Sequence, residues 1–169
     1  MAKFLVASDI HGSLISFNRV MELFNEHKAD KLILLGDVFG AYADEMVEAL
    51  NGIANRVTII KGNNDWYFEP ENAKFKLFEH TYENINGKVA YLSHGHKLND
   101  SNLAEYGAKI VMFGHFHRPI LRKENDIVIF SPGSIAKPRM GADKCYGIID
   151  DKKIQIFNDN DELYDELEY

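Results

Sequence analysis

The chain has 169 residues, of which 46% are apolar and 27% are charged, and this size suits one domain over residues 1–169. No apolar run approaches the roughly 20 residues of a bilayer-spanning helix, and the N-terminal run 4–7 is too short for a signal peptide. We therefore expect a soluble, cytoplasmic protein that does not use a membrane. The formal net charge of −7 argues against binding of duplex nucleic acid, which needs Lys and Arg to neutralise phosphates.

Cysteine usage restricts the kinds of metal site that the chain can build. Cys145 is the only cysteine, which excludes an internal disulfide and any multi-cysteine zinc site. Any metal ion must therefore be held by nitrogen and oxygen donors.

The predicted elements alternate between strands and helices in the first part of the chain. A strand at residues 3–8 precedes a helix at 14–27, whose apolar residues repeat at helical spacing behind the N-cap Ser13. The remaining elements, in chain order, are a strand at 32–35, a helix at 44–51, strands at 57–60 and 89–93, a short helix at 101–106, and strands at 110–113, 127–130, 146–149 and 153–157.

The order of these elements favours a two-sheet α/β sandwich with an αββα arrangement of layers. Early β-α-β alternation predicts parallel strands under helices, whereas turns at 124–126 and 150–151 predict antiparallel hairpins late in the chain. The acidic segment 158–169 is expected to be a solvated, partly helical terminus, with a role in interactions as the alternative.

Polar side chains follow one strand after another, directly beyond the last apolar residue. Ligands bind at such strand ends in open α/β sheets, so we expect five strand ends to meet at one cleft. The segments are Asp9-Ile10-His11, Gly36-Asp37, Gly62-Asn63-Asn64-Asp65, His94-Gly95-His96 and Gly114-His115-Phe116-His117. In an extended segment residues i and i+2 point the same way, so Asp9 and His11 would share one place, as would His115 and His117. Imidazoles, carboxylates and an amide carbonyl suit Mn, Fe, Ni, Co or Zn.

Each of these residues also has an ordinary structural explanation. A lone Asp after a strand commonly caps a helix or forms a turn, and a lone His is more often a hydrogen-bonded structural residue than a ligand. Five of the seven histidines, however, lie at predicted strand ends, which favours a metal site over coincidence. His27 and His80 are interpreted as ordinary helix or loop residues.

In order along the chain, the five segments resemble the signature of the calcineurin-like metallophosphoesterase superfamily. The compact length and the segment Ser131-Pro132-Gly133-Ser134 are similar to the small YfcE-type phosphodiesterase branch, which the retromer subunit Vps29 also resembles. The resemblance implies two divalent metal ions at the C-terminal ends of the strands, with Mn favoured over Ni, Zn, Fe or Co. It assigns one ion to Asp9, His11, Asp37 and His117, and the other to Asp37, Asn63, His94 and His115.

The same resemblance implies hydrolysis of a small phosphodiester by a hydroxide that both cations activate, with Asp37 as the bridging carboxylate. It gives catalytic roles to Asp37, Asn63, His94 and His96.

Larger relatives carry a His where this chain has Asn64, and Asn cannot donate a proton as an acid. Either the leaving group needs little assistance, or water or His96 supplies it, or catalysis is weak. Asp65 is a candidate for orienting an imidazole or the Asn63 loop.

Residues beside these loops are candidates for contacts with substrate. Asn64 and Arg118 are the predicted substrate-binding residues, and Lys137 and Arg139 are further candidates, although solvated surface cations are commoner. The aromatic run 66–68 would suit stacking on a nucleoside or aryl ester, but burial over the sheet edge is the favoured interpretation. Ser134 lacks the partners of a nucleophile, so we interpret 131–134 as a turn below or beside the metals.

The favoured function is therefore that of an enzyme, a phosphoric diester hydrolase. The alternative is a protein-binding scaffold of the retromer-subunit type with little or no catalysis, and a fold without metal ranks third. A scaffold would be expected to lose some ligands, whereas this chain keeps all seven. A homo-oligomer is compatible with the resemblance.

Overall fold

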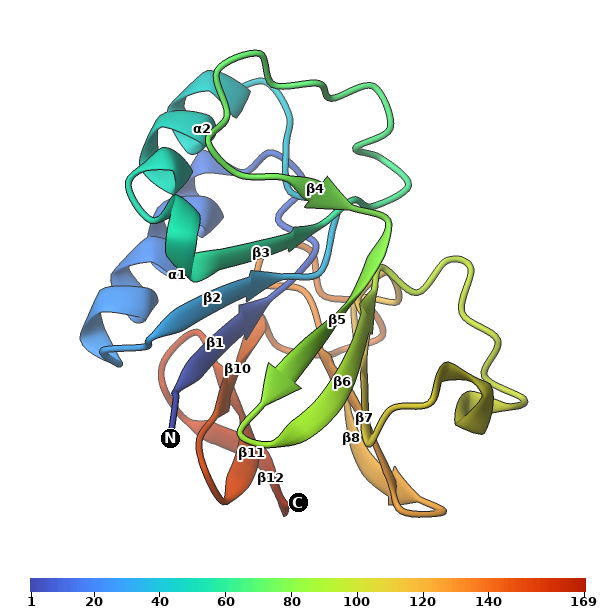
Figure 1. Cartoon of the computed structure of the whole chain (residues 1–169). Helices are drawn as coiled ribbons and strands as arrows, with labels where there is room; N and C mark the ends of the chain where they lie inside the picture. The colour runs from blue at the N-terminus through green and yellow to red at the C-terminus, as the bar shows by residue number, and fades with distance from the viewer.

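Two β-sheets packed face to face form the centre of the molecule, and helices α1 (Leu14–Glu26) and α2 (Ala43–Asn51) cover the outer face of the larger sheet (Figure 1). The structure is a computed structural model that describes residues 1–169. The predicted two-sheet α/β sandwich is confirmed. Both termini lie at the end of the molecule opposite α2 (Figure 1).

The larger sheet has seven strands in the order β12-β11-β10-β1-β2-β3-β4. Strands β1 to β4 are parallel to one another, and β10, β11 and β12 continue the sheet in antiparallel fashion. The bounds are β1 (Phe4–Ala7), β2 (Lys31–Leu34), β3 (Val57–Ile60), β4 (Leu77–Phe78), β10 (Cys145–Ile149), β11 (Lys153–Asn158) and β12 (Leu163–Glu168). Because β1, β2 and β3 are parallel, the loops that follow them leave the sheet at the same edge.

The second sheet has five strands in the order β5-β6-β7-β9-β8. Its three central strands are parallel, and the two outer strands run antiparallel to their neighbours. The bounds are β5 (His80–Ile85), β6 (Lys88–Ser93), β7 (Ile110–Met112), β8 (Pro119–Glu124) and β9 (Ile127–Pro132). On its outer face Leu103, from the short 3-10 helix η2 (Leu103–Tyr106), packs against a small cluster that includes Val111 and Ile129.

Strand β1 shows how the sequence divides between two hydrophobic layers. Phe4 and Val6 belong to the core between the sheets, while Leu5 and Ala7 belong to the core under the helices. This alternation follows from the strand period of two residues. A run that is apolar on both faces therefore occupies the middle of the sandwich.

Helix α1 begins where the sequence predicts it. The Ser13 hydroxyl accepts a hydrogen bond from the Ser16 backbone N–H at 3.2 Å, which satisfies one of the free N–H groups of the first turn. The helix ends at Glu26, two residues before Lys28 takes a left-handed φ of 51°. Another 3-10 turn, η1 (Ala54–Arg56), links α2 to β3.

The predicted strands and the two predicted α-helices are all present within one or two residues of their expected bounds. Four strands were not predicted, namely β4, β5, β8 and β12. The helix expected at 101–106 is only the 3-10 turn η2. His80 begins strand β5 and is therefore not a helix or loop residue.

The acidic terminus is solvent-exposed as predicted, but the expected partial helix is wrong, because residues 163–168 form an edge strand. Strand β12 pairs antiparallel with β11, and Lys153 Nζ lies 2.9 Å from Glu166 Oε2 across the pair. The half-buried Leu167 packs against the core between the sheets. The polar sequence reflects exposure of an edge strand, since charged residues on such an edge discourage pairing with other chains.

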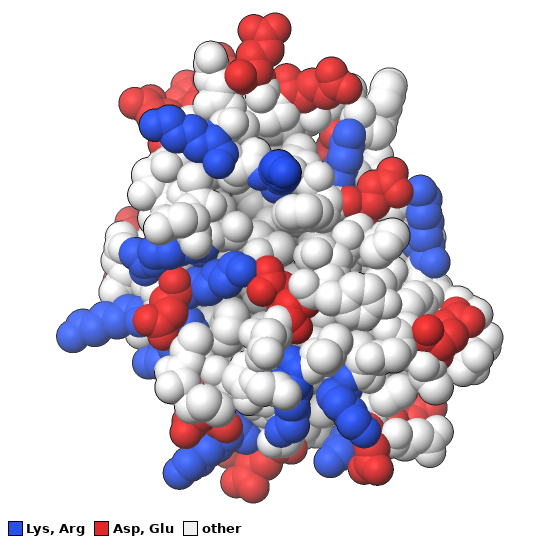
Figure 2. Space-filling view, viewed as in Figure 1, with Lys and Arg blue, Asp and Glu red and all other residues white.

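None of the helices combines the length and the hydropathy that a bilayer crossing requires. On the face drawn in Figure 2, acidic and basic side chains are intermixed, and no continuous basic surface is present.

Candidate metal centre

The loops after five parallel strands bring the predicted ligands toward one another. Strands β1, β2 and β3 of the larger sheet end just before Asp9, Asp37 and Asn63, and strands β6 and β7 of the other sheet end just before His94 and His115. Residues far apart in the sequence therefore meet where the two sheets come together. Five of them, Asp9, His11, Asp37, His94 and His117, form the cluster described next, which we call the metal centre.

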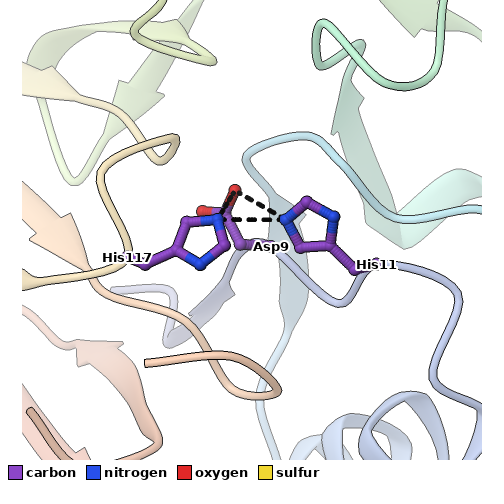
Figure 3. A group of neighbouring side chains, drawn as sticks. All are labelled: Asp9, His11 and His117. Carbon is purple, nitrogen blue, oxygen red and sulfur yellow. Dashed lines mark hydrogen bonds and ion pairs between the residues drawn. The ribbon is translucent and has the colours of Figure 1, made fainter. Parts of the chain in front are cut away.

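Three donors form the first part of the metal centre (Figure 3). Asp9 Oδ1 lies 3.7 Å from His11 Nε2 and 3.3 Å from His117 Nε2, and the two imidazole nitrogens are 3.0 Å apart. The side chains come from the β1–α1 loop and from the loop after β7, and their donor atoms point at one another (Figure 3). Such spacing places all three atoms around one position.

The second part of the centre contains Asp37 and His94, with Asp9 beside them. His94 Nε2 lies 3.2 Å from Asp37 Oδ2 and 3.9 Å from Asp9 Oδ1. Asp37 Oδ2 is also 3.6 Å from His11 Nε2. The Asp37 carboxylate therefore lies between a histidine of each part, and so does Asp9 Oδ1, which belongs to both groups of donors.

Asn63 and His115 lie next to this second part. His115 Nδ1 is 3.2 Å from Asn63 Oδ1, and the His115 ring lies edge-on to His94 with centroids 5.1 Å apart. Asn63 is exposed and His115 is half-buried. All seven predicted ligands are thus neighbours, with Asn63 and His115 on the solvent side.

The backbone at the ligands is turned rather than extended, which corrects the predicted geometry. Asp9, His11, Asp37, His115 and His117 all have left-handed φ values, between 50° and 72°. Such conformations are uncommon for residues other than Gly and cluster at functional sites. As a result His117 joins Asp9 and His11, while His115 lies beside His94 and Asn63, whereas an extended segment would have placed the two histidines together.

The tautomers of two buried histidines indicate that a cation fits this centre. His94 Nδ1 lies 2.7 Å from the Leu35 carbonyl and His117 Nδ1 lies 2.5 Å from the Lys137 carbonyl. A carbonyl only accepts, so each Nδ1 carries a hydrogen and Nε2 is the ring nitrogen that turns toward the centre. Asp9 Oδ1 and His94 Nε2 are buried without a hydrogen-bond partner, which is costly unless another group satisfies them.

The charges of the centre also favour a cation. Burial raises the pKa of Asp9, but the neighbouring imidazoles of His11, His117 and His94 outweigh that effect and hold the pKa well below its ordinary value. Burial likewise opposes ionisation of Asp37, yet His94 and Asn64 lower its pKa to about 2. Burial lowers the pKa of His94, but Asp37 more than compensates and raises it. Two ionised carboxylates thus make positive charge favourable at this point.

Asp65 holds two loops of the centre in place. Its buried carboxylate accepts backbone N–H groups of Asp37 at 2.8 Å, Gly62 at 2.9 Å, and Val38 and Phe39 at 3.2 Å. The prediction that Asp65 orients the Asn63 loop fits the bond to Gly62, whereas no bond joins Asp65 to an imidazole. Sequence reasoning did not foresee the bonds to the loop that carries Asp37.

Two glycines allow these loops to approach closely. A Cβ on Gly62 would collide with the Asp37 carboxylate and backbone nitrogen. A Cβ on Gly36, whose φ is 99°, would lie 2.5 Å from His94 Nδ1. Both positions therefore require the absence of a side chain.

Two serines support Asp9 and were not singled out for this role. Ser8 Oγ donates to Asp9 Oδ2 at 2.7 Å, and Ser134 Oγ donates to the Asp9 carbonyl at 2.8 Å. The His115 backbone N–H also donates to Asp9 Oδ2 at 3.0 Å. The predicted position of 131–134 beside the metals agrees with this contact, but Ser131 and Pro132 belong to strand β9 and are therefore not part of a turn. The only signal for Ser8 was its position immediately before Asp9.

The predicted substrate-binding residues have other partners or face solvent. The Asn64 side-chain amide donates to Asp37 Oδ2 at 2.8 Å. Arg118 is exposed, and its guanidinium lies 3.4 Å from the Met140 sulfur. Lys137 and Arg139 have exposed side chains but hold His117 through their backbones.

A cavity of about 450 Å³ opens beside Asn63 and His94. His96 lines it, with its ring centroid 5.4 Å from His94, and burial together with His94 lowers the pKa of His96. Trp66 also lines the cavity and is 73% exposed, and Tyr67 is 57% exposed. The favoured interpretation that this aromatic run is buried is therefore wrong for these two residues, while Phe68 does pack against the core.

Comparisons with known proteins agree with the geometry. Residues 2–153 match the family model described as the calcineurin-like phosphoesterase superfamily domain. Phosphodiesterase YfcE of Escherichia coli strain K12 is 32% identical, with 96% of this chain and 95% of that protein covered. A phosphodiesterase of Methanocaldococcus jannaschii, MJ0936, is 25% identical over 88% of this chain and 92% of its own.

Solved structures show the same fold. The structure of the Escherichia coli phosphoesterase YfcE matches with a TM-score of 0.88 and 28% identity, covering 98% of each chain. Vacuolar protein sorting 29 from Cryptosporidium parvum matches with a TM-score of 0.74 at 18% identity, covering 99% of this chain and 98% of its own, and this likeness concerns the fold alone. The expected enzyme class, a phosphoric diester hydrolase, is confirmed by these matches. The chain belongs to the calcineurin-like phosphoesterase superfamily.

Proposed function

We propose that this protein hydrolyses small phosphodiesters with two divalent cations, Mn being the favoured metal. One cation would be held by Asp9, His11, Asp37 and His117, and the other by Asp37, Asn63, His94 and His115. The observation that carries the proposal is the Asp37 carboxylate, whose Oδ2 lies 3.6 Å from His11 Nε2 and 3.2 Å from His94 Nε2. When bound, the two cations supply a hydroxide nucleophile at neutral pH and neutralise the phosphoryl oxygens.

The residues of the chain supply positions and charges for this reaction. Asp37 and Asp9 are ionised and place negative charge between the histidines. The carbonyls of Leu35 and Lys137 fix the rings of His94 and His117, as metal-binding histidines require. His96 is exposed at the wall of the adjoining cavity, but its lowered pKa disfavours the protonated ring, so water is the main proton source for a departing alkoxide in this proposal.

Asn64 favours diesters over monoesters. Its side chain is committed to Asp37, and an amide cannot act as an acid. Esters with good leaving groups need little protonation, so an activated diester should be a better substrate than an alkyl monoester. A cytoplasmic location and self-association stay predictions, as does the alternative of a protein-binding scaffold.

The direct test is turnover of bis(p-nitrophenyl) phosphate by metal-stripped protein reconstituted with Mn. The reconstituted protein should release p-nitrophenol, and Asp37→Ala should reduce the rate to background. Asp150→Ala is the matched control, because Asp150 lies in the β10–β11 turn and its carboxylate accepts only backbone N–H groups of that turn. Equal rates for the wild-type protein and Asp37→Ala would overturn the proposal.

A further inference from the structure

The cavity beside the metal centre has the walls of a site for a flat aromatic group. Trp66 follows the Asn63 loop, lines the cavity and leaves 73% of its surface exposed. An indole exposed at the edge of a cavity is free to stack on a flat ligand. Tyr91 forms part of another wall and is itself stacked on Tyr106 with ring centroids 4.4 Å apart.

The remaining walls are polar. Glu79 offers a carboxylate, His80 an imidazole, and Lys61 and Lys97 two cations. Ser93 also lines the cavity, but its Oγ is buried and has no hydrogen-bond partner, so the accessible polar groups are those of Glu79, His80 and the two lysines. The cavity therefore combines a stacking surface with donors and acceptors for the edge of a ring.

We propose that this cavity binds the base of a nucleoside phosphodiester, with the base stacked on Trp66 and its polar edge directed to Glu79 and His80. The inference rests on the proposed function, because the cavity shares Asn63 and His94 with the metal centre. A phosphate held at that centre would therefore have its ester substituent at the mouth of the cavity. The volume of about 450 Å³ falls in the range of small-molecule sites.

The chemistry of the walls favours a nucleoside over other ester substituents. A lipid chain would need a mainly apolar wall, whereas this cavity is lined mostly by charged and polar groups. A simple alkyl or sugar ester would leave the exposed indole uncovered. A heteroaromatic base provides both a flat face and hydrogen-bonding edges, and stacking of a base on an aromatic side chain raises affinity by about tenfold or more.

The fluorescence of Trp66 reports whether the cavity is occupied, because Trp66 is the only tryptophan of the chain. Mn-loaded protein is titrated with adenosine 5′-monophosphate and, in parallel, with ribose 5-phosphate, which lacks only the base. Indole fluorescence, excited where adenine does not absorb, should change with the nucleotide at concentrations where ribose 5-phosphate has no effect. Equal responses to the two ligands, or no response to either, would overturn the inference.

Inhibition of bis(p-nitrophenyl) phosphate hydrolysis gives a second readout. Adenosine 5′-monophosphate should inhibit at a concentration about tenfold or more below that of ribose 5-phosphate. In Trp66→Ala the two compounds should inhibit at similar concentrations. In Trp66→Phe most of the difference between them should remain. Tyr67→Ala is the matched control, because Tyr67 is the neighbouring exposed aromatic residue and does not line the cavity. A ratio unchanged in Trp66→Ala would contradict the role of Trp66.

The two readouts separate this inference from the proposed function. A nucleotide-dependent fluorescence change without turnover of the diester would overturn the proposed function and support a base-binding cavity. Turnover with neither base-dependent fluorescence nor base-dependent inhibition would support the proposed function and overturn the cavity assignment.

Discussion

Asn64 donates two hydrogen bonds to the carboxylate of Asp37. The backbone N–H of Asn64 lies 2.9 Å from Asp37 Oδ1, and its side-chain amide nitrogen lies 2.8 Å from Asp37 Oδ2. The residue that stands in place of a histidine of larger relatives thus serves to hold the carboxylate between the two parts of the metal centre. This position therefore couples the choice of leaving group to the geometry of Asp37.

Replacing Asn64 by His should shift the protein toward monoesters. An imidazole at this position can protonate an alkoxide leaving group, while the backbone bond to Asp37 is kept. We expect the ratio of kcat/KM for a phosphomonoester to that for bis(p-nitrophenyl) phosphate to rise by about tenfold or more. Asn64→Ala is the control, since it loses the same amide and adds no acid. A ratio that stays constant or falls in Asn64→His would remove the leaving-group argument.

Asp65→Asn should destabilise the loops of the metal centre. The Asp65 carboxylate accepts hydrogen bonds only from backbone N–H groups. The side-chain amide of Asn at this position would place its own N–H groups against these donors, and the hydrogen bonds there would be lost. The free energy of unfolding, measured by chemical denaturation, should fall by about 2–3 kcal/mol, and Mn should bind more weakly. Asp150→Asn is the matched control, because Asp150 accepts backbone N–H groups of Lys152 and Lys153 in a surface turn. Equal losses in the two variants would refute a special role for Asp65.

Gly62→Ala should disturb the metal centre through simple steric collision. The added methyl group would meet the Asp37 carboxylate, and overpacking of this kind costs about 1–3 kcal/mol. We expect diester hydrolysis to fall together with stability. Gly87→Ala is a control for backbone effects, because Gly87 has a φ of 90° and open space around it. Gly87→Ala should lose stability but keep its rate of diester hydrolysis. Full activity of Gly62→Ala would contradict the close approach of Gly62 to Asp37.

The stability of the metal-free protein should be highest in mildly acidic solution. Asp37 has its pKa lowered from 3.8 to about 2, so its contribution is present above pH 3.8 and is lost as the pH falls toward 2. His94 has its pKa raised above 6.5, so its contribution is present below pH 6.5 and is lost as the pH rises through the raised value.

Mn should reverse the dependence of stability on pH above pH 6.5. A cation takes the place of the His94 proton, so protons compete with the metal and stability should rise with pH above 6.5. Thermal unfolding measured across this pH range, with and without saturating Mn, checks the sign. The same slope in both conditions would show that His94 does not bind the metal.

The fold was predictable where apolar runs are continuous and not where exposure breaks the pattern. Strands β1, β2 and β3 are buried and have apolar runs that end at Gly or a polar residue. Strands β5 and β12, in contrast, alternate or expose most of their side chains, and their pairing partners determine their structure. Edge strands of this kind resemble loops in sequence, because their stability comes from hydrogen bonds to a neighbour.

The candidate site was predictable in its residues but not in its local geometry. Asp9, His11, Asp37, His94 and His117 do cluster, because the parallel strands of each sheet end at a common edge and these two edges meet. The left-handed backbone that separates His115 from His117 has no signature other than the neighbouring glycines. The exposure of Trp66 also depends on which loop covers which strand end, and a local sequence pattern does not contain that information.

The number of Mn ions bound per chain tests the central claim most directly. Metal-stripped protein is equilibrated with Mn, freed of unbound metal and submitted to elemental analysis, with Asp37→Ala measured in parallel. Two ions per wild-type chain, and a clear loss in the variant, are expected from a carboxylate that serves both positions. One ion or none in the wild-type protein would contradict a dinuclear centre.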